Sequence, residues 1–556
     1  MQNQRNYLAI MVLTDFLLQS IAPFFPNSRF IPKAKIKSGY VKLVEKNLIE
    51  KFNEINLSLV ANDQKIMFSK KFGADIQEIS ILKLNQFHYQ WLSKVLLGNL
   101  NFVVSLCLSQ DLGTRLIYPL SKDWIAEFNS QGVKTRNFLS HNFFKIFMLI
   151  RLIQSIGRTF GFLVSSFHRN KDIVNSSSTE SDCLYLPNLQ SGHLNGNCSD
   201  NLVGWLKKRE FLKNNATIVH SNLELSSVVS DCKNVNFKYV NLRWRWNSSI
   251  TKDLFVRFIL TLKCIKILAA HSNKQIAFLH LHEILLALYT LKMAPRKILK
   301  NSLFDQSQGS LLPLWASALS ELECRRILFF YAIAAEPILQ SGKEFLPSLF
   351  ANSSWDEIWV IDSEQKRILQ SVISKPGVEF KEIGVPTWIN SNESIPSTKS
   401  SIALFDSAPQ KNLFFLSPSV ALGLYSEEFY SLFFSDILQR AKYYNYTILH
   451  KGKKFTNKSM EPFYQKIRGE MHIKYEEHYK FIDYNMAPTK LLKSCVAAIC
   501  QPISTTALIS RSLGKPTVFY DPLNKVSQSD RALRGISVLK SKDLDQWFET
   551  LERSRK

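Results

Sequence analysis

Three consecutive hydroxyl side chains, Ser504, Thr505 and Thr506, form the stretch with the clearest chemical meaning. They follow an apolar run that ends at Cys500, and an amphipathic segment over 507–513 follows them. A helix that begins here would bring free backbone N–H groups, hydroxyl donors and the positive end of its dipole to one place. The pattern predicts a phosphate-binding seat, and ordinary helix capping explains the same residues equally well.

A basic run over 450–454 lies directly after the strand expected at 446–449 and contains Lys451. Residues that follow the strands of one parallel sheet share an edge, so we expect Lys451 and the loop 417–419 near the hydroxyl residues. Lysine beside hydroxyls suits a phosphate-bearing ligand, whereas a solvated loop is the plainer alternative. No Walker A sequence and no GxGxxG occur, which argues against P-loop chemistry and a standard dinucleotide site.

The first half of the chain offers a second polar loop, formed by Gln308, Gly309 and Ser310. It follows a strand-like run, carries a glycine that permits close backbone approach, and opens a helix. Glu336 comes directly after another expected strand, where a general base could stand. An ordinary strand-end acid before a turn proline is the structural alternative for Glu336.

The other aspartate, histidine and cysteine residues show no spacing typical of a catalytic or metal site. Further candidates for a base are Asp305, Asp406 and Asp521. The following histidines lack metal-ligand spacing, and we expect them in the core or at its rim: His220, His280, His282 and His450. No DxD-type metal motif is apparent and the 8 cysteines form no CxxC pair, so we expect a metal-independent reaction, no cofactor and buried reduced thiols.

Apolar runs and amphipathic segments alternate from about residue 255 onward, which is typical of doubly wound α/β sheets. Strands are expected at 216–220, 275–280, 298–304, 326–332, 357–362, 378–383, 412–416, 446–449, 479–482, 495–500 and 517–520. Helices are expected at 254–269, 281–292, 311–322, 364–373, 426–443, 487–493 and 507–513, with one long helix or two over 136–164. Ser426 is expected to cap the helix that follows it.

The predicted fold class is α/β, with two Rossmann-like domains facing across a cleft and an N-terminal extension that is harder to interpret. The predicted parts are an N-terminal region at 1–169, a flexible Ser/Asn-rich segment at 170–201, a first Rossmann-like domain at 202–389, a linker at 390–401 and a second Rossmann-like domain at 402–556.

The chain of 556 residues carries a formal charge of +24, which points to acidic partners. Its basic residues are spread along the chain, and no zinc-finger spacing, RRM signature or basic zipper occurs. We therefore expect no sequence-specific nucleic-acid binding. The run Arg243-Trp244-Arg245-Trp246 has the composition of a nonspecific RNA site, although a strand edge explains it more simply.

The apolar stretch 143–164 comes closest to a membrane segment. Lys145, Arg151 and Arg158 interrupt it at near-helical spacing, so no membrane span is predicted. These charges could lie along one face of an amphipathic helix that rests on anionic lipid. A core helix with a basic rim is the alternative.

Several stretches resemble the bacterial surface-polysaccharide biosynthesis proteins named for a Pro-Phe-Thr-Ser motif and, more broadly, the GT-B glycosyltransferases. The matching pieces are 308–315, 355–362, 449–454, 487–488 and 504–522. The naming motif stands here as Pro502-Ile503-Ser504-Thr505, with Ile in place of Phe and the two hydroxyl residues exchanged.

The resemblance implies transfer of a sugar from a nucleotide-sugar donor to a cell-surface polysaccharide or lipid-linked glycan acceptor. It implies a location in the bacterial cytoplasm, at the inner face of the membrane. It assigns the donor phosphate to Ser504, Thr505, Thr506 and Lys451, where fixed donors would stabilise the leaving group. It assigns the acceptor to Gln308, Gly309 and Ser310, with Glu336 as the base.

Two other functions remain open at this point. A glycerophosphate or phosphosugar transferase with a CDP-linked donor would use the same phosphate seat. A catalytically inactive scaffold of a surface-glycan assembly complex would retain the fold without a base.

Overall fold

The computed structural model describes residues 120–130, 135, 137–164, 183–186, 205–206, 209–211, 217–220, 238–241, 250–269, 278–293, 300–305, 312–333, 338–340, 343–345, 355–373, 376–387, 400–409, 423–452, 460–483 and 486–555. The chain divides into two compact units. Unit 1 comprises 1–173, 244–294 and 310–322, and unit 2 comprises 174–243, 295–309 and 323–556. The predicted domain boundaries stay predictions.

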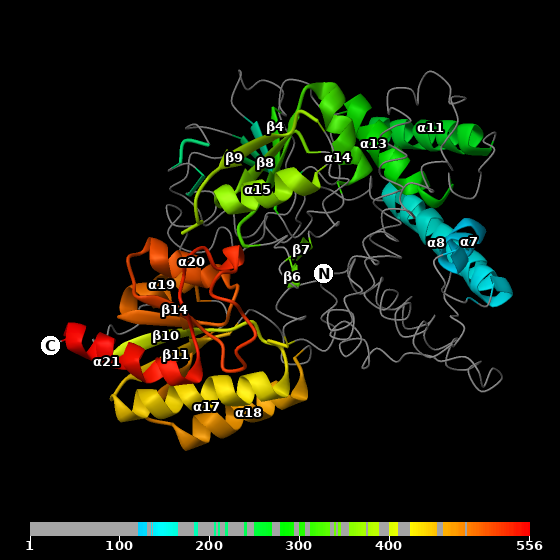
Figure 1. Ribbon diagram of the computed structural model, residues 1–556. Helices are drawn as coiled ribbons and strands as arrows, with labels where there is room; N and C mark the ends of the chain where they lie inside the picture. The colour runs from blue at the N-terminus through cyan, green and yellow to red at the C-terminus, as the bar shows by residue number, and fades with distance from the viewer. Residues whose placement is uncertain are drawn as a thin grey trace. The chain divides into compact units, whose positions relative to one another are not determined.

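Unit 2 contains a first parallel sheet in the order β3-β2-β1-β4-β5-β8-β9. Figure 1 labels β4, β8 and β9 of this sheet. Its strands are β1 (Cys183–Leu186), β2 (Thr217–His220), β3 (Lys238–Asn241), β4 (Asn301–Asp305), β5 (Arg325–Phe329), β8 (Glu357–Val360) and β9 (Glu379–Glu382). A short antiparallel pair, β6 (Ile338–Gln340) and β7 (Lys343–Phe345), stands apart from it. Strand β8 is buried along its whole length, as expected of a strand covered on both faces.

Helix α15 (Ser363–Val372) follows β8 and begins at a side-chain cap. Asp362 accepts a hydrogen bond from the backbone N–H of Gln365 at 2.8 Å. This cap fixes the start of α15 at the carboxyl end of β8.

A second parallel sheet lies in the same unit, in the order β12-β11-β10-β13-β14-β15. Its strands are β10 (Ser401–Phe405), β11 (Thr447–Lys451), β12 (Tyr479–Phe481), β13 (Ala497–Cys500), β14 (Thr517–Tyr520) and β15 (Val538–Leu539). Its helices are α17 (Glu427–Tyr443), α18 (Pro462–Lys474), α19 (Pro488–Ser494), α20 (Thr505–Ser512) and α21 (Leu544–Arg555), with 3₁₀ turns η12 (Arg531–Leu533) and η13 (Ser541–Asp543).

The second sheet is built on continuous apolar strands. Every residue of β10 and β13 is buried, which explains why these strands can occupy the middle of the sheet. Helix α17 packs Phe429, Phe433 and Phe434 into the same core. The predicted cap of α17 is confirmed, because Ser426 accepts a hydrogen bond from the N–H of Phe429 at 3.1 Å.

Unit 1 is helical in its described parts. It contains α7 (Lys122–Ser130), α8 (Asn137–Val164), α11 (Ile250–Ala269), α13 (Leu281–Met293), α14 (Leu314–Ala318) and the 3₁₀ turn η9 (Leu319–Leu322). Helix α13 packs against α8, α11 and α14, and its buried residues form the apolar centre of the unit. The long apolar stretch is one helix rather than two.

Three expectations about elements are corrected by the structure. The segment 170–201, predicted to be flexible, contains β1, which pairs with β2 and β4. The first strand of the second sheet begins at Ser401, inside the end of the predicted linker, and the predicted strand at 412–416 lies outside the described residues. Residues 278–280, predicted as the end of a strand, form a helical turn that leads into α13.

Candidate functional site

The second sheet reverses its winding direction between β10 and β13. The chain runs outward from β10 through β11 to β12, and then returns to the other side of β10 with β13. In open α/β sheets a ligand lies in the crevice outside the carboxyl ends of the strands at such a reversal. The residues after Phe405 and after Cys500 are therefore the candidate site.

The strand register brings the basic and hydroxyl residues to the same edge. Phe405 pairs with Lys451 on one side and with Cys500 on the other, so these residues lie at one level. Strands β11 and β13 are two positions apart, which corresponds to about 10 Å. Lys451 and the residues that lead to α20 thus lie at the same edge of the sheet.

Gln501 connects the two strands at the reversal. Its Oε1 accepts hydrogen bonds from the N–H of Ser407 at 2.8 Å and from the hydroxyl of Tyr430 at 3.3 Å. Its Nε2 donates to the carbonyl oxygen of Leu424 at 2.8 Å. The sequence analysis missed Gln501, although an amide directly after a buried apolar run was the available signal.

The N-terminus of α20 is not capped by a side chain. Ser504 occupies the N-cap position, but its side chain makes no capping hydrogen bond. Its hydroxyl contacts the hydroxyl of Thr506 instead. Ordinary capping by Ser504 is therefore excluded, and the first backbone N–H groups of α20 lack that partner.

The residue before the cap has an unfavourable backbone conformation. Ile503 has a φ of +62°, and it is the one β-branched residue among the described non-glycine residues with positive φ. A β-branched side chain in this region is a genuine outlier, and such strain is concentrated at ligand sites and active sites. Ile503 occupies the second position of the Pro-Ile-Ser-Thr motif, so the strain lies within the motif itself.

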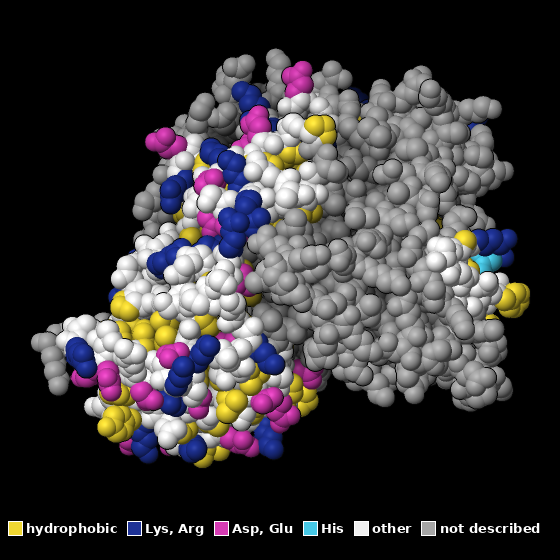
Figure 2. Space-filling view, viewed as in Figure 1, with side chains coloured by type: hydrophobic (Ala, Val, Ile, Leu, Met, Phe, Trp, Pro, Cys, Tyr) yellow, Lys and Arg dark blue, Asp and Glu magenta, His cyan; other side chains and the backbone are white. Residues whose placement is uncertain are grey.

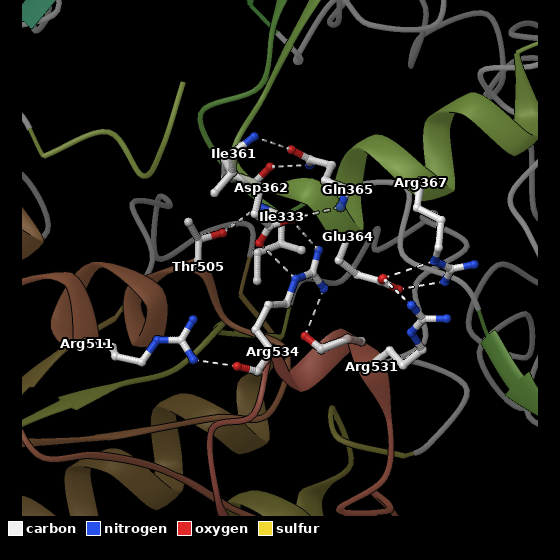
Figure 3. Close-up of polar contacts among 12 residues, drawn as sticks. Ile333, Ile361, Asp362, Glu364, Gln365, Arg367, Thr505, Arg511, Arg531 and Arg534 are labelled. Atoms are coloured by element: carbon white, nitrogen blue, oxygen red, sulfur yellow. Dashed lines mark hydrogen bonds and ion pairs between the residues drawn. The ribbon is translucent and has the colours of Figure 1, made fainter. Parts of the chain in front are cut away.

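Thr505 has a different role from its two neighbours. Its hydroxyl oxygen accepts a hydrogen bond from the backbone N–H of Ile333 at 2.7 Å (Figure 3). Ile333 follows β5 of the first sheet, so this bond links the two sheets of unit 2. Thr505 was predicted as a phosphate ligand, and the structure shows it engaged in this link.

A second link lies beside the first and consists of ion pairs (Figure 3). Arg534, whose side chain is only 6% exposed, places Nε 3.1 Å from Oδ2 of Asp362, the cap of α15. Arg531 lies 3.3 Å from Glu364, which also pairs with Arg367. Hydrogen bonding by Arg367, with the charges of the other arginines, lowers the pKa of Glu364.

Lys451 is buried at the end of β11. Its Nζ donates to the carbonyl oxygen of Gly452 at 3.3 Å. In open α/β sheets ligands lie at the carboxyl ends of the strands, and a lysine at such an end can neutralise a phosphate. The adjacent Lys453 and Lys454 lie outside the described residues, as does the loop 417–419.

Asp406, a candidate base, belongs to a buried polar cluster beneath this edge. The hydroxyl of Tyr464 donates to Asp406 Oδ2 at 2.7 Å, and Asp406 Oδ1 lies 3.2 Å from Nε2 of His450. The hydroxyl of Tyr479 lies 2.6 Å from Nδ1 of His450. Both side chains of the Asp406–His450 pair have no exposed surface, so Asp406 supports the edge from below rather than facing it.

Asp521 holds a loop in place. Its two side-chain oxygens accept backbone N–H hydrogen bonds from Leu523, Lys525 and Val526 at 3.1, 2.6 and 2.7 Å. The Asp521 side chain is buried and both of its oxygens are engaged by its own loop, so its role there is structural.

The predicted acceptor residues and the predicted base lie outside the described residues: Gln308, Gly309, Ser310 and Glu336. Asp305 is the last residue of β4. Within the described residues, no group of three or more His, Cys, Asp or Glu side chains is arranged to hold a metal ion.

The described architecture defines an α/β protein with two parallel sheets and an uncapped helix N-terminus at the reversal of the second. This confirms the predicted α/β class and the two parallel sheets. The chain belongs to the polysaccharide biosynthesis PFTS motif protein family, which it matches over residues 256–548. The predicted family is therefore confirmed.

Solved structures resemble the chain at low sequence identity. TarM matches with 12% identity over 49% of this chain and 51% of its own, at a TM-score of 0.28, so the chain spans about half the length of TarM. Os79 from O. sativa, solved with UDP and deoxynivalenol-3-glucoside, matches with 12% identity over 67% and 94%, at a TM-score of 0.37. ADP-heptose LPS heptosyltransferase II from E. coli matches with 10% identity over 67% and 99%, at 0.31. No curated protein matches.

Proposed function

We propose that this protein transfers a sugar from a nucleotide-sugar donor to a cell-surface polysaccharide or lipid-linked glycan acceptor. Membership of the polysaccharide biosynthesis PFTS motif family supports the biological context. The observation that carries the proposal is the uncapped start of α20 at the point where the second sheet reverses.

The donor phosphates would bind at this start of α20. The first N–H groups of the helix, the hydroxyls of Ser504 and Thr506, and the helix dipole together favour an anion. Lys451, at the same level of the sheet, would neutralise part of the diphosphate charge. Because negative charge grows on the leaving nucleotide in the transition state, these fixed donors would act on the rate as well as on binding.

The three hydroxyl residues would have different roles, whereas the sequence led us to expect that all three bind the donor phosphate. Thr505 accepts the N–H of Ile333, so its hydroxyl would position the start of α20 more than it would bind the ligand. The strained Ile503 would hold the preceding turn in the conformation that leaves the N–H groups clear. The acceptor roles of Gln308, Gly309 and Ser310 and the basic role of Glu336 remain sequence-based predictions.

Calorimetry with UDP, GDP, CDP and CMP tests the proposal. We expect one nucleoside diphosphate to bind selectively and the Ser504→Ala/Thr506→Ala variant to lose at least about tenfold in affinity, since hydrogen bonds to a charged group contribute about 1.5–3 kcal/mol each. Ser512→Ala, at the far end of the same helix, is the matched control and should bind like the unmodified protein. Its hydroxyl bonds the carbonyl oxygen of Ile509.

The outcomes separate the candidate functions. Binding of UDP or GDP, followed by transfer from the matching sugar nucleotide, supports the glycosyltransferase. Selective binding of CDP or CMP would favour a transferase of glycerophosphate or phosphosugar groups. A folded protein that binds none of the four would favour a scaffold and remove the main support for an enzyme.

A further inference from the structure

Helix α8 of unit 1 directs large apolar side chains outward. The exposed set is Phe138, Ile146, Leu149, Ile153, Ile156, Phe160 and Val164. Most members are three or four residues apart, so they form one stripe along the helix. Phe138, Ile153 and Phe160 are 78%, 61% and 67% exposed, which is unusual for a helix that faces water.

The opposite face of α8 is largely polar although it is buried. Four of its six buried residues are polar: Ser140, Arg151, Ser155 and Thr159. A surface helix of a water-soluble domain has the reverse arrangement, with its apolar stripe inward. Among the described helices, α8 is also the one long and apolar enough to cross a membrane by length and composition, and only 28% of its most apolar window is buried.

Helix α11 repeats the same reversal independently. Its exposed apolar side chains are Phe255, Phe258, Leu262 and Ile265. Its buried face contains the ion pair between Asp253 and Arg257, whose atoms are 2.9 Å apart and whose side chains have no exposed surface. Two helices of one unit therefore each direct large apolar side chains outward.

The buried charges connect all three long helices of the unit. Arg257 Nη1 donates to the carbonyl oxygen of Phe162 on α8 at 2.6 Å, and the guanidinium lies over the rings of Phe162 and Tyr289. Tyr289 on α13 donates to Asp253. Charged groups that pair inside a helical unit while apolar groups face outward are typical of proteins in contact with lipid.

The exposed charges on these two helices are of one sign. The exposed basic side chains are Lys145 on α8 and Lys252, Lys263 and Lys266 on α11. The two helices contain one acidic residue, Asp253, and it is buried. At about 3.6 residues per turn, Lys263 and Lys266 lie along one border of the apolar stripe of α11. Figure 2 shows basic and hydrophobic side chains side by side on the described patch that corresponds to α7 and α8 in Figure 1.

We propose that α8 and α11 attach unit 1 to the surface of an anionic lipid bilayer. The apolar stripes would enter the boundary between headgroups and acyl chains, and the lysines would contact anionic headgroups. Another helix could also cover an apolar stripe with this spacing. The uniformly basic exposed charge and the paired charges in the interior favour lipid. The proposal does not depend on the transferase function.

Flotation of the full chain with lipid vesicles tests the proposal. We expect the protein to float with phosphatidylcholine vesicles that contain phosphatidylglycerol, and much less with phosphatidylcholine alone. Ile153→Glu/Phe160→Glu should lower the partition coefficient of the protein between vesicles and water at least tenfold. The transfer of each large apolar side chain out of water changes this coefficient by more than a factor of ten. Ile473→Glu on α18 is the matched control, since Ile473 is 81% exposed and lies in unit 2.

Three further measurements test the role of the lysines, the folding of the variants and their oligomeric state. Lys145→Gln/Lys266→Gln should weaken flotation and reduce its dependence on salt. Circular dichroism checks that each variant is folded, and Phe255→Glu on α11 replaces the α8 variant should that one misfold. Light scattering reports the oligomeric state of each protein.

Several results would overturn the proposal. One is that the unmodified protein stays at the bottom of the gradient with both kinds of vesicle. Others are that it floats equally with neutral vesicles, or that the α8 variant floats like the unmodified protein. A variant that dissociates an oligomer while flotation is unchanged would show that a second copy covers the stripe.

Discussion

Individual side chains make the starts of two helices beside the second sheet differ. Two serines occupy the N-cap positions of α17 and α20, two helices that accompany the second sheet. The side chain of Ser426 accepts a capping hydrogen bond from the backbone, whereas that of Ser504 does not. The Ser504 hydroxyl contacts that of Thr506 instead, and the preceding residue, Ile503, has a left-handed conformation. The same residue type therefore stabilises one helix and leaves the start of another open to a ligand.

The two serines should respond differently to substitution. Ser426→Ala should lower the free energy of unfolding by about 1 kcal/mol, which is the usual cost of losing a side-chain cap. Ser504→Ala should cost clearly less, because no capping bond is lost. Urea unfolding of both variants without ligand measures the difference. Equal losses would show that Ser504 caps α20 after all.

Glu364 should make stability depend on pH. Because its pKa is lowered in the folded state, the stability it contributes is present above its ordinary pKa and is lost as the pH falls through the lowered one. Glu364→Gln should therefore destabilise the protein near neutral pH and have little effect in acid. Urea midpoints at several pH values measure this.

Glu470→Gln provides the comparison for Glu364. Glu470 is 57% exposed and lies 3.9 Å from Lys466 on the same helix, so its removal should change stability little at any pH. A loss for Glu364→Gln that stays constant from neutral to acid pH would contradict the assigned cause.

At the scale of strands and helices, elements with a clear helical period were predicted well, whereas short strands in Ser- and Asn-rich sequence were predicted poorly. Helices α13, α15 and α17 were predicted within a few residues, because their apolar residues recur at the helical period. Strands β1 and β10 were missed, because each is a short apolar run beside Ser- and Asn-rich sequence that favours a loop prediction.

The candidate site was predictable only in part for the same reason. The start of α20 could be found from three adjacent hydroxyls, since a helix start is a local pattern. The hydrogen bond between Ile333 and Thr505 joins residues that are 172 positions apart, and no pattern in either local sequence predicts it. The positive φ of Ile503 was equally invisible, because Ile is a poor choice for that conformation.

Gln501 should prove important for the edge between β10 and β13. Gln501→Ala would leave the N–H of Ser407 and the carbonyl oxygen of Leu424 without their partner, at a cost on the order of 3 kcal/mol. Gln439→Ala on the exposed face of α17 serves as the control and should be nearly neutral. Thermal or urea unfolding compares the two, and a neutral Gln501→Ala would refute the bridging role.

For the whole molecule, the two sheets of unit 2 are joined by apolar residues such as Ile361, which lies in the core of the second sheet, and by polar pairs, two of which are next to the candidate site. The links run from Ile333 to Thr505 and from Asp362 to Arg534. Both lie next to the start of α20 or the loop after β14, so the proposed ligand site and the contact between the sheets involve adjacent residues.

Buried thiols should report opening of the second sheet as a whole. Burial raises the pKa of both Cys495 and Cys500 to about 12, so each is a neutral, inaccessible thiol in the folded protein. At pH 8 we expect iodoacetamide to modify them only when the sheet unfolds. Site-resolved mass spectrometry across a urea series measures this. Labelling of Cys500 well below the unfolding transition would contradict it.

The order of strands also has a consequence for synthesis on the ribosome. The second sheet draws all its strands from one continuous run, Ser401 to Leu539, whereas the first sheet pairs β1 with β4 across the intervening helices of unit 1. Distant pairings form more slowly than near ones. We therefore expect the part of the chain from Ser401 onward to acquire its structure first after release. Pulsed hydrogen exchange during refolding would show protection in β10 and β13 before β1 and β4, and the reverse order would refute it.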